Sequence, residues 1–95
     1  MKYNYSAEKD FLLIEERGIS FDEIIAAIES DQVLDIKPHP NKERYPDQKL
    51  MVVDVKEYVY IVPFVEQENG TVFLKTIYPS RKAKKDYLKG DSYET

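Results

Sequence analysis

Hydrophobic residues recur at helical spacing in a stretch close to the N-terminus. Ser6 precedes this stretch and can cap a helix, and Gly18 follows it at the position where a left-handed residue closes a helix. The pattern therefore predicts a helix over Ala7–Arg17. Its apolar stripe, which we expect to face the core, comprises Ala7, Phe11 and Ile14, widened by Leu12 and Leu13.

A second helix is predicted directly after the first. Ser20 and Glu23 form a capping box, with the serine at the N-cap and the glutamate three residues later. Only Gly18 and Ile19 connect the two helices, which favours a tight αα-hairpin ending near Ser30. The apolar stripe of this helix comprises Phe21, Ile24, Ile25 and Ile28.

The rest of the chain is dominated by segments with strand character. Asn69-Gly70 indicates a hairpin turn between the last two strands, so we expect an antiparallel meander. Pro63 lacks a ladder donor, which predicts a bulge or an outward-facing position. The predicted strands are Tyr3-Asn4-Tyr5, Val33–Lys37, Lys49–Val55, Tyr58–Glu66 and Thr71–Tyr78.

The strands are apolar on both faces, so both faces need a cover. One face should pack on the αα-hairpin, and the C-terminal helix, a partner chain or a substrate could cover the other. Ser80 can cap a helix over Arg81–Lys89 that Gly90 ends. We therefore expect one α+β domain over residues 1–90, with an N-terminal αα-hairpin packed on an antiparallel sheet of about four strands, a short C-terminal helix, and a polar tail over residues 91–95.

Composition excludes several classes of protein. The chain has 95 residues, no cysteine and one histidine, so neither a disulfide framework nor a zinc site is expected, and no cofactor is predicted. No apolar run is long enough for a membrane span, and the N-terminus lacks the apolar region of a signal peptide, so we expect a cytoplasmic protein. The formal net charge is −4.

The charges are unevenly distributed. Residues 1–36 carry three basic and nine acidic side chains, whereas residues 71–90 carry six basic side chains and one acidic one. Such asymmetry is typical of a basic working face backed by an acidic one, and equally of a solvated C-terminal helix.

The residues that could take part in catalysis or binding lie in the long loop over residues 38–47 and around the last strand. Arg44 and Arg81 could together clamp a phosphate, and Lys75 could add positive charge. Metal-independent RNA cleavage needs such cations together with an acid and a base. Glu43 or His39 could be the acid or the base, and Tyr45 or Tyr78 could stack on a nucleobase.

The order of these segments resembles the BrnT-type toxins, a branch of the RelE/ParE-like superfamily. The similarity begins with the aromatic strand and Lys9, continues through Glu16–Glu23, and includes His39 and Glu43-Arg44. It closes with Ile77-Tyr78-Pro79-Ser80-Arg81-Lys82-Ala83 and the basic helix that ends in Lys84-Lys85-Asp86-Tyr87. The resemblance covers residues 3–88 and implies a RelE-like fold.

The resemblance also implies an activity. BrnT-type toxins are mRNA interferases of type II toxin–antitoxin pairs, neutralised by a small DNA-binding antitoxin encoded next to them. It implies RNA as substrate. Under the resulting hypothesis of a ribonuclease toxin, Arg44, Arg81, Glu43 and His39 are the expected catalytic residues, and an oligomer is possible. Lys9, Lys75, Lys84, Tyr45 and Tyr78 would bind the substrate.

Three departures from the family pattern bear on this activity. Arg17 stands where the family has a histidine, Pro79-Ser80-Arg81 replaces Ser-Ala-Arg, and the last helix has lysines in place of arginines. An alternative is a non-catalytic, RelE-like protein-binding module that uses the second sheet face with Tyr58, Tyr60 and Phe64. A third is a toxin that acts on a protein target.

Overall fold

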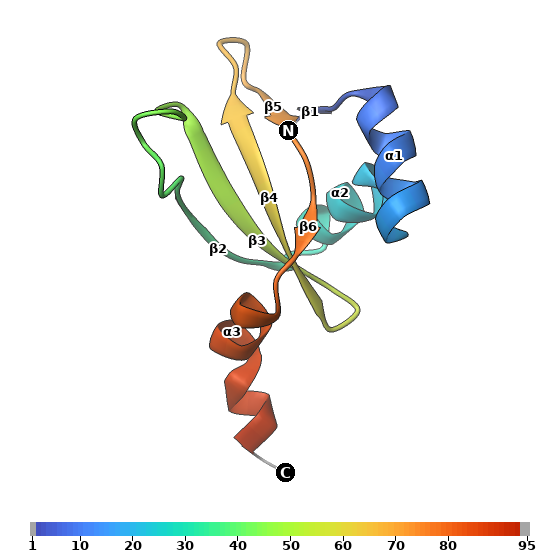
Figure 1. Ribbon diagram of the computed structural model, residues 1–95, viewed down its shortest axis with the longest axis vertical. Helices are drawn as coiled ribbons and strands as arrows, with labels where there is room; N and C mark the ends of the chain where they lie inside the picture. Colours follow the sequence, from blue (N-terminus) through green and yellow to red (C-terminus); the bar gives the residue numbers. More distant parts are fainter. Residues whose placement is uncertain (1, 94–95) are drawn as a thin grey trace.

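The fold was analysed in a computed structural model that describes residues 2–93, with the side chains of residues 2–88. Three helices and six strands make up this part of the chain (Figure 1). The order along the chain is β1 (Lys2–Asn4), α1 (Ala7–Arg17), α2 (Phe21–Glu29), β2 (Val33–Pro38), β3 (Gln48–Val55), β4 (Tyr58–Glu66), β5 (Thr71–Leu74), β6 (Tyr78–Pro79) and α3 (Arg81–Tyr93). None of these helices is long and apolar enough to cross a membrane.

The strands form one sheet in the order β1-β5-β4-β3-β2, with β6 also paired to β4. All pairs are antiparallel except β1 with β5, which run parallel. The α+β class is thus confirmed, and the sheet is larger than expected because β1 joins it and the last strand is split. The split falls at residues 75–77, between β5 and β6.

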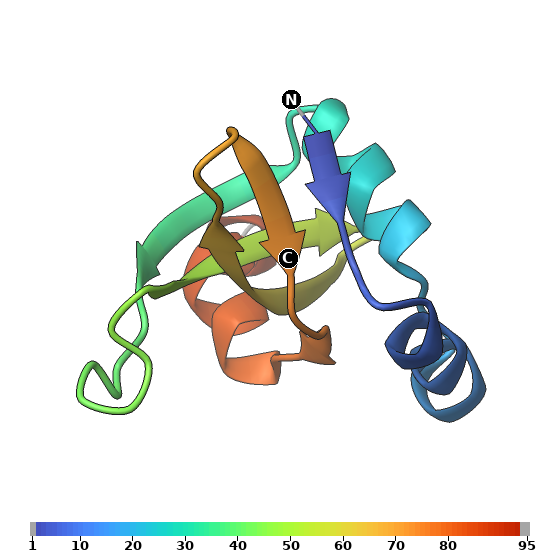
Figure 2. The same cartoon turned by 90° about the horizontal axis from the view of Figure 1, so that it is seen from above.

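Helices α2 and α3 lie on opposite faces of this sheet, as the view from above makes clear (Figure 2). We call the side chains that point toward α2 the α2 face, and those that point toward α3 the α3 face. The buried core of the α2 face includes Met51, Val53, Val62, Phe64, Val72 and Leu74 from the strands. The buried core of the α3 face includes Leu50, Val52, Val59, Ile61 and Ala83.

The C-terminal helix is therefore the cover of the second sheet face. This corrects the expectation of a partner surface formed by Tyr58, Tyr60 and Phe64. Phe64 is buried on the α2 face and Tyr60 packs against the same core, so of the three only Tyr58 is exposed. Side chains alternate between the two faces along β4, so residues two apart share a face. Tyr60 and Phe64 therefore both belong to the face that α2 covers, and not to the second face.

The helix ends follow the local sequence signals closely. Ser6 accepts the Lys9 N–H at 3.2 Å, and Gly18 adopts a φ of 66° that closes α1. The capping box of α2 is also present, with Ser20 N–H donating to the Glu23 carboxylate at 2.9 Å. These predictions are confirmed because each cap is decided within one helical turn.

The orientation of α1 was predicted wrongly. Leu13 is its buried side chain, whereas Phe11 and Ile14 are 64% and 46% exposed. The helix stands beside the edge of the sheet and does not lie across a face (Figures 1 and 2). The expected stripe exists, but it points to solvent, since periodicity identifies an apolar stripe without identifying what it contacts.

Two further expectations need correction. Pro63 is buried opposite Leu50 in an unbroken β3–β4 register, with neither a bulge nor an outward position. Its carbonyl accepts the Lys75 N–H at 2.8 Å, so its missing donor faces residues 75–77, where strand pairing is interrupted. Gly90 lies inside α3, which continues to Tyr93, because a glycine weakens a helix without forbidding it. Glu94 and Thr95 of the expected polar tail lie outside the described residues.

The hairpin between β4 and β5 is confirmed, with a turn longer than two residues. Gly70 N–H donates to the Gln67 carbonyl at 3.0 Å, and Gln67 N–H donates to the Thr71 carbonyl at 2.8 Å. Gly70 has a φ of 83°, whereas Asn69 does not have a positive φ. This geometry corresponds to a turn followed by one left-handed residue.

The orientation of α1 predicts that two substitutions in this helix lower the stability by very different amounts. Leu13→Ala should lower the free energy of unfolding by about 2–5 kcal/mol, since it leaves a cavity in the core. Phe11→Ala should change it by no more than about 0.5 kcal/mol, because the ring is mostly in solvent. Urea unfolding followed by circular dichroism measures both; equal losses would contradict the described orientation.

Candidate functional site

Side chains of distant segments share a row across the α3 face. Lys37 pairs with Leu50, and Leu50 pairs with Pro63. Lys75 extends this row, since its N–H donates to the Pro63 carbonyl at 2.8 Å. Directly paired residues point to the same face, so two exposed lysines flank a buried apolar floor.

A second row lies beside the first, toward the end of β4. Gln48 pairs with Val65, and Val65 pairs with Phe73. His39 joins it through its N–H, which donates to the Gln48 carbonyl at 3.2 Å. We call these two rows the platform. The two ends of each row are three strand spacings apart, which is about 14 Å.

The ring of Phe73 restrains one lysine of the platform. The Lys75 ammonium lies 5.4 Å from the centre of that ring, a distance at which the cation is attracted to the ring face. Lys75 therefore lies on the α3 face, although it follows β5 and is not inside the strand that the sequence predicted. Its side chain is exposed and faces solvent.

The loop over residues 39–47 gathers several predicted site residues at one end of the platform. The rings of His39 and Tyr45 lie 4.6 Å apart between centroids, and the Arg44 guanidinium lies 5.4 Å from the Tyr45 ring. Arg44 N–H also donates to the Asn41 side chain at 3.1 Å. A hollow of about 590 Å³ lies beside this loop; its lining includes Gln48 and Val65 of the platform.

His39 is held in one tautomer by its own loop. Its Nδ1 accepts the Asn41 N–H at 3.0 Å, so the proton of the neutral ring is on Nε2. In this arrangement Nε2 can donate a hydrogen bond to a phosphate oxygen. Glu43 is exposed and has no described hydrogen bond or ion pair within residues 2–88, so its carboxylate is free to act as a base.

The start of α3 brings another group of predicted residues to the α3 face. Tyr78 pairs with Ile61, which places its ring on this face, and burial raises the pKa of its hydroxyl. The hydroxyl is thus protonated at neutral pH and can donate. Arg81 is the first, exposed residue of α3, and the Lys84 ammonium lies 5.5 Å from the Tyr58 ring.

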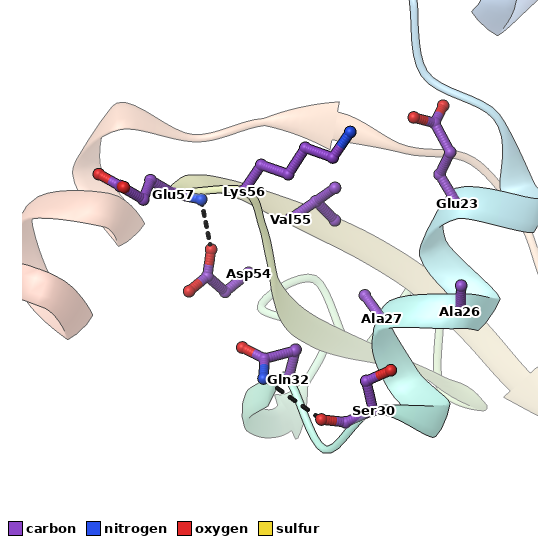
Figure 3. A pocket seen from close by; sticks show the side chains of 9 residues that line it. All are labelled: Glu23, Ala26, Ala27, Ser30, Gln32, Asp54, Val55, Lys56 and Glu57. Carbon is purple, nitrogen blue, oxygen red and sulfur yellow. Dashed lines mark hydrogen bonds between the residues drawn. The ribbon is translucent and has the colours of Figure 1, made fainter.

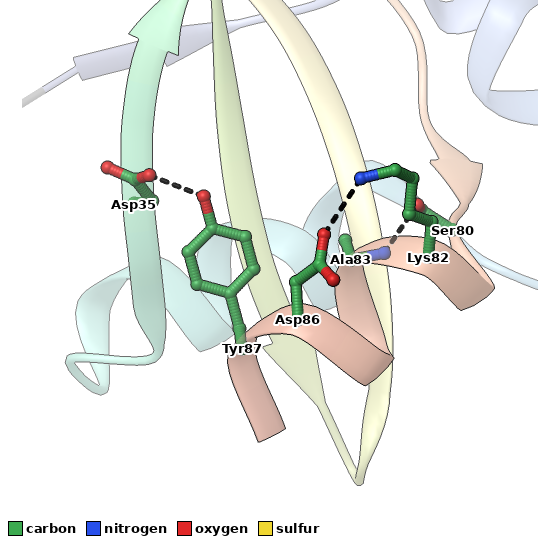
Figure 4. A network of polar contacts seen from close by, with 6 residues as sticks. All are labelled: Asp35, Ser80, Lys82, Ala83, Asp86 and Tyr87. Atoms are coloured by element: carbon green, nitrogen blue, oxygen red, sulfur yellow. Dashed lines mark hydrogen bonds and ion pairs between the residues drawn. The ribbon is translucent and has the colours of Figure 1, made fainter. Parts of the chain in front are cut away.

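Local contacts seat α3 on the sheet (Figure 4). The Ser80 hydroxyl accepts the Ala83 N–H at 3.0 Å and caps the helix, as predicted. Tyr87 donates to the Asp35 carboxylate at 2.5 Å and so ties the helix to β2. Lys37 lies 5.8 Å from the centre of the Tyr87 ring, which connects this contact to the platform.

The structure does not join the two arginines in a clamp. Gln48, beside the loop of Arg44, pairs with Val65, whereas Pro79, beside Arg81, pairs with Tyr60. These points on β4 are five residues apart, or about 16 Å. Lys9 is also separate, because it belongs to α1, which stands beyond the edge strand β1 (Figure 1).

A cavity of about 480 Å³ lies between α2 and the turn from β3 to β4, away from the platform (Figure 3). Its rim carries the carboxylates of Glu23, Asp54 and Glu57 beside a single lysine, Lys56. These carboxylates would repel a phosphate, so the cavity is not the expected RNA site. Among residues 2–88, no group of three or more potential ligands could hold a metal ion.

Comparisons with known proteins agree with this architecture. No protein-family model matches the chain, and no curated protein matches its sequence. A solved structure does match: the ribonuclease toxin BrnT of Brucella abortus, with a TM-score of 0.63 and 16% sequence identity. The match covers 84% of this chain and 96% of that one. The chain has the fold of BrnT.

Two residues of this BrnT-like fold were missed as candidates. Lys37 belongs to the platform, but only the register of β2 against β3 brings it opposite Leu50. Arg17 donates from the end of α1 to the Ile77 carbonyl, and thereby holds the segment between Lys75 and Tyr78. Its place in the αα-hairpin was visible in the sequence, whereas its contact sixty residues away was not.

The contact between Tyr87 and Asp35 predicts a defined pH dependence of stability. This hydrogen bond lowers the pKa of Asp35 and raises the pKa of Tyr87. Its stabilisation is therefore complete between about pH 4 and pH 10, the ordinary values of the two groups. It is lost as the pH falls through the lowered pKa of Asp35 or rises through the raised pKa of Tyr87.

Tyr87→Phe should accordingly be less stable than the wild type near neutral pH, with the difference shrinking at both extremes. Thermal unfolding across pH measures it. Tyr58→Phe is the matched control, since no hydrogen bond of its hydroxyl is described. A constant difference between wild type and Tyr87→Phe from pH 3 to pH 11 would show that the hydroxyl is not involved.

Proposed function

We propose that this protein is the toxin of a bacterial toxin–antitoxin pair and cleaves RNA on the platform without a metal ion. The observation that carries the proposal is the BrnT fold together with the lysines and aromatic rings that this fold gathers on the α3 face. The matched Brucella protein is named a ribonuclease toxin. Cleavage of mRNA would inhibit translation in the cytoplasm.

The reaction we propose is an internal transesterification. A base removes the proton of the ribose 2′-hydroxyl, and the 2′-oxygen attacks the adjacent phosphorus. The bond from phosphorus to the 5′-oxygen breaks, and an acid supplies the proton that this oxygen needs. The products are a 2′,3′-cyclic phosphate and a 5′-hydroxyl, so neither water nor a metal-bound nucleophile takes part in this step.

We assign the roles by position and chemistry. Lys75 and Arg81 would stabilise the negative charge that develops on the phosphate, since both are exposed cations on the α3 face. Tyr78 would donate a proton to the 5′-oxygen from its protonated hydroxyl. Arg44, in the loop about 16 Å away along β4, would hold a neighbouring phosphate and not the same one.

The remaining loop residues complete the proposal. Glu43 lies in the same loop as Arg44, so we assign it to the neighbouring nucleotide together with Arg44 and assign no residue as the base. His39 would then hold a phosphate oxygen, while Tyr45 would stack on a nucleobase. Lys84 would extend the cationic surface beyond the platform, and Lys9 would contribute only long-range potential from α1.

A non-catalytic binding module remains the second candidate, and one observation favours it. Phe11, Leu12 and Ile14 are all substantially exposed on α1, which is typical of a surface that contacts another protein. The two functions are compatible, because a toxin of this kind needs a neutralising antitoxin. A toxin that acts on a protein target would arrest growth while leaving mRNA intact.

Removing one cation of the platform tests the RNase proposal. Lys75→Gln and Arg81→Gln should each reduce the rate of RNA cleavage by about 100-fold, the usual cost of losing one group that stabilises transition-state charge. Lys49→Gln is the matched control, since it removes the same charge from the α2 face. Cleavage of a labelled single-stranded RNA by the purified proteins measures all three.

Growth after inducible expression gives the same comparison in cells. The wild type and Lys49→Gln should arrest growth, the two platform variants should not, and co-expression of the adjacent gene should relieve the arrest. A folded wild-type protein that neither cleaves RNA nor arrests growth would refute the RNase proposal and favour the binding module. Arrest with intact mRNA would indicate a protein target.

The transesterification predicts a distinct chemical requirement. Cleavage should continue in excess EDTA, and a 2′-deoxy substitution at the scissile nucleotide should abolish it, because the 2′-oxygen is the nucleophile. Mass spectrometry of the products should find the 2′,3′-cyclic phosphate. Loss of cleavage in EDTA that magnesium restores would contradict the mechanism.

A further inference from the structure

Helix α1 is held in one orientation by contacts along its inner side. Leu13 is buried in the core of the α2 face. The Asp10 carboxylate accepts the Phe21 N–H at 2.8 Å, which ties α1 to the start of α2. Arg17 donates to the Ile77 carbonyl and ties the end of α1 to the segment before β6. These anchors decide which side of α1 faces solvent.

The solvent-facing surface of α1 carries several apolar side chains. Phe11, Leu12 and Ile14 are 64%, 48% and 46% exposed. Ala7, four residues before Phe11, and Ile14, three residues after it, share one face of the helix with Phe11, whereas Leu12 lies beyond Glu8 and Glu15. A groove of about 390 Å³ is lined by Ala7, Glu8, Phe11 and Leu12. We call Ala7, Phe11 and Ile14 the α1 stripe.

The charges beside the α1 stripe are acidic. Glu8 and Glu15 both neighbour Phe11 on the helix surface, at three residues before it and four after it. Both are exposed, and no hydrogen bond or ion pair is described for either within residues 2–88. A partner that covers the stripe must therefore accept two carboxylates at its rim.

A second copy of the chain is a poor occupant for this reason. Two α1 helices packed antiparallel about Phe11 would bring Glu8 of one copy against Ile14 of the other and Glu15 against Ala7, twice by symmetry. Parallel packing would oppose Glu8 to Glu8 and Glu15 to Glu15. Neither arrangement places a cation beside these carboxylates, which is unfavourable at an interface.

We propose that the α1 stripe binds an amphipathic helix of another protein, whose apolar face is flanked by lysine or arginine. Apolar residues one turn apart on that helix would cover Phe11 and Ile14, and its basic flank would pair with Glu8 and Glu15. The stripe lies on α1, apart from the platform, so this binding does not require RNA cleavage.

Designed helical peptides test the proposal directly. Two peptides share one leucine stripe, and one is flanked by lysines and the other by glutamates. Fluorescence anisotropy at low salt should find the lysine-flanked peptide bound about tenfold more tightly, with the difference decreasing as salt is added. Phe11→Gln/Ile14→Gln should lower its affinity about tenfold or more.

Control variants separate this binding from unfolding and from RNA cleavage. Ile36→Gln replaces a similarly exposed apolar residue on β2 and should leave peptide binding unchanged, as should Lys75→Gln. The double variant should retain its Tm, since glutamine favours a helix and neither side chain is buried.

Equal affinity for the two peptides, no binding of either, or unchanged binding by the double variant would overturn the proposal. Sedimentation of the free protein adds one more outcome: a dimer that the double variant dissociates would assign the stripe to a second copy. None of these results depends on whether the protein cleaves RNA.

Discussion

The apolar character of β3 and β4 on both faces is the constraint on which this structure depends. Neither strand can leave a face in water, so one helix is needed on each side of the sheet. The chain supplies α2 before the sheet and α3 after it (Figure 2). The platform lies on the α3 face beside this helix, with a buried apolar floor and exposed lysines at its ends.

Features decided within a few residues could be predicted from the sequence. The caps at Ser6, Gly18, Ser20 and Ser80 and most strand bounds are of this kind. Features that depend on distant contacts could not. The parallel pairing of β1 with β5, the break between β5 and β6, and the outward turn of α1 each require knowledge of which segments meet. A helical stripe has the same period whether it faces a core or a partner.

The same distinction between local and long-range features applies to the candidate site. His39, Arg44 and Tyr45 lie together because they belong to one short loop, so proximity in sequence was a sufficient guide. The clamp of Arg44 with Arg81 was an inference about space, and the register of β4 separates the two. Lys37 could not be identified as a candidate from the sequence, because only the strand register shows that it lies opposite Leu50.

Aromatic rings restrain the lysines of the platform and of α3. A lysine cannot make the two parallel hydrogen bonds that an arginine makes to a phosphate, and its long side chain loses more freedom on binding. Three lysines here each lie within 6 Å of an aromatic ring: Lys37 over Tyr87, Lys75 over Phe73 and Lys84 over Tyr58. Each ring restrains its ammonium before any ligand arrives, which reduces the entropy lost on binding. In the proposed function, such a surface would hold a chain of phosphates by point charges and would rely less on the geometry of any one contact.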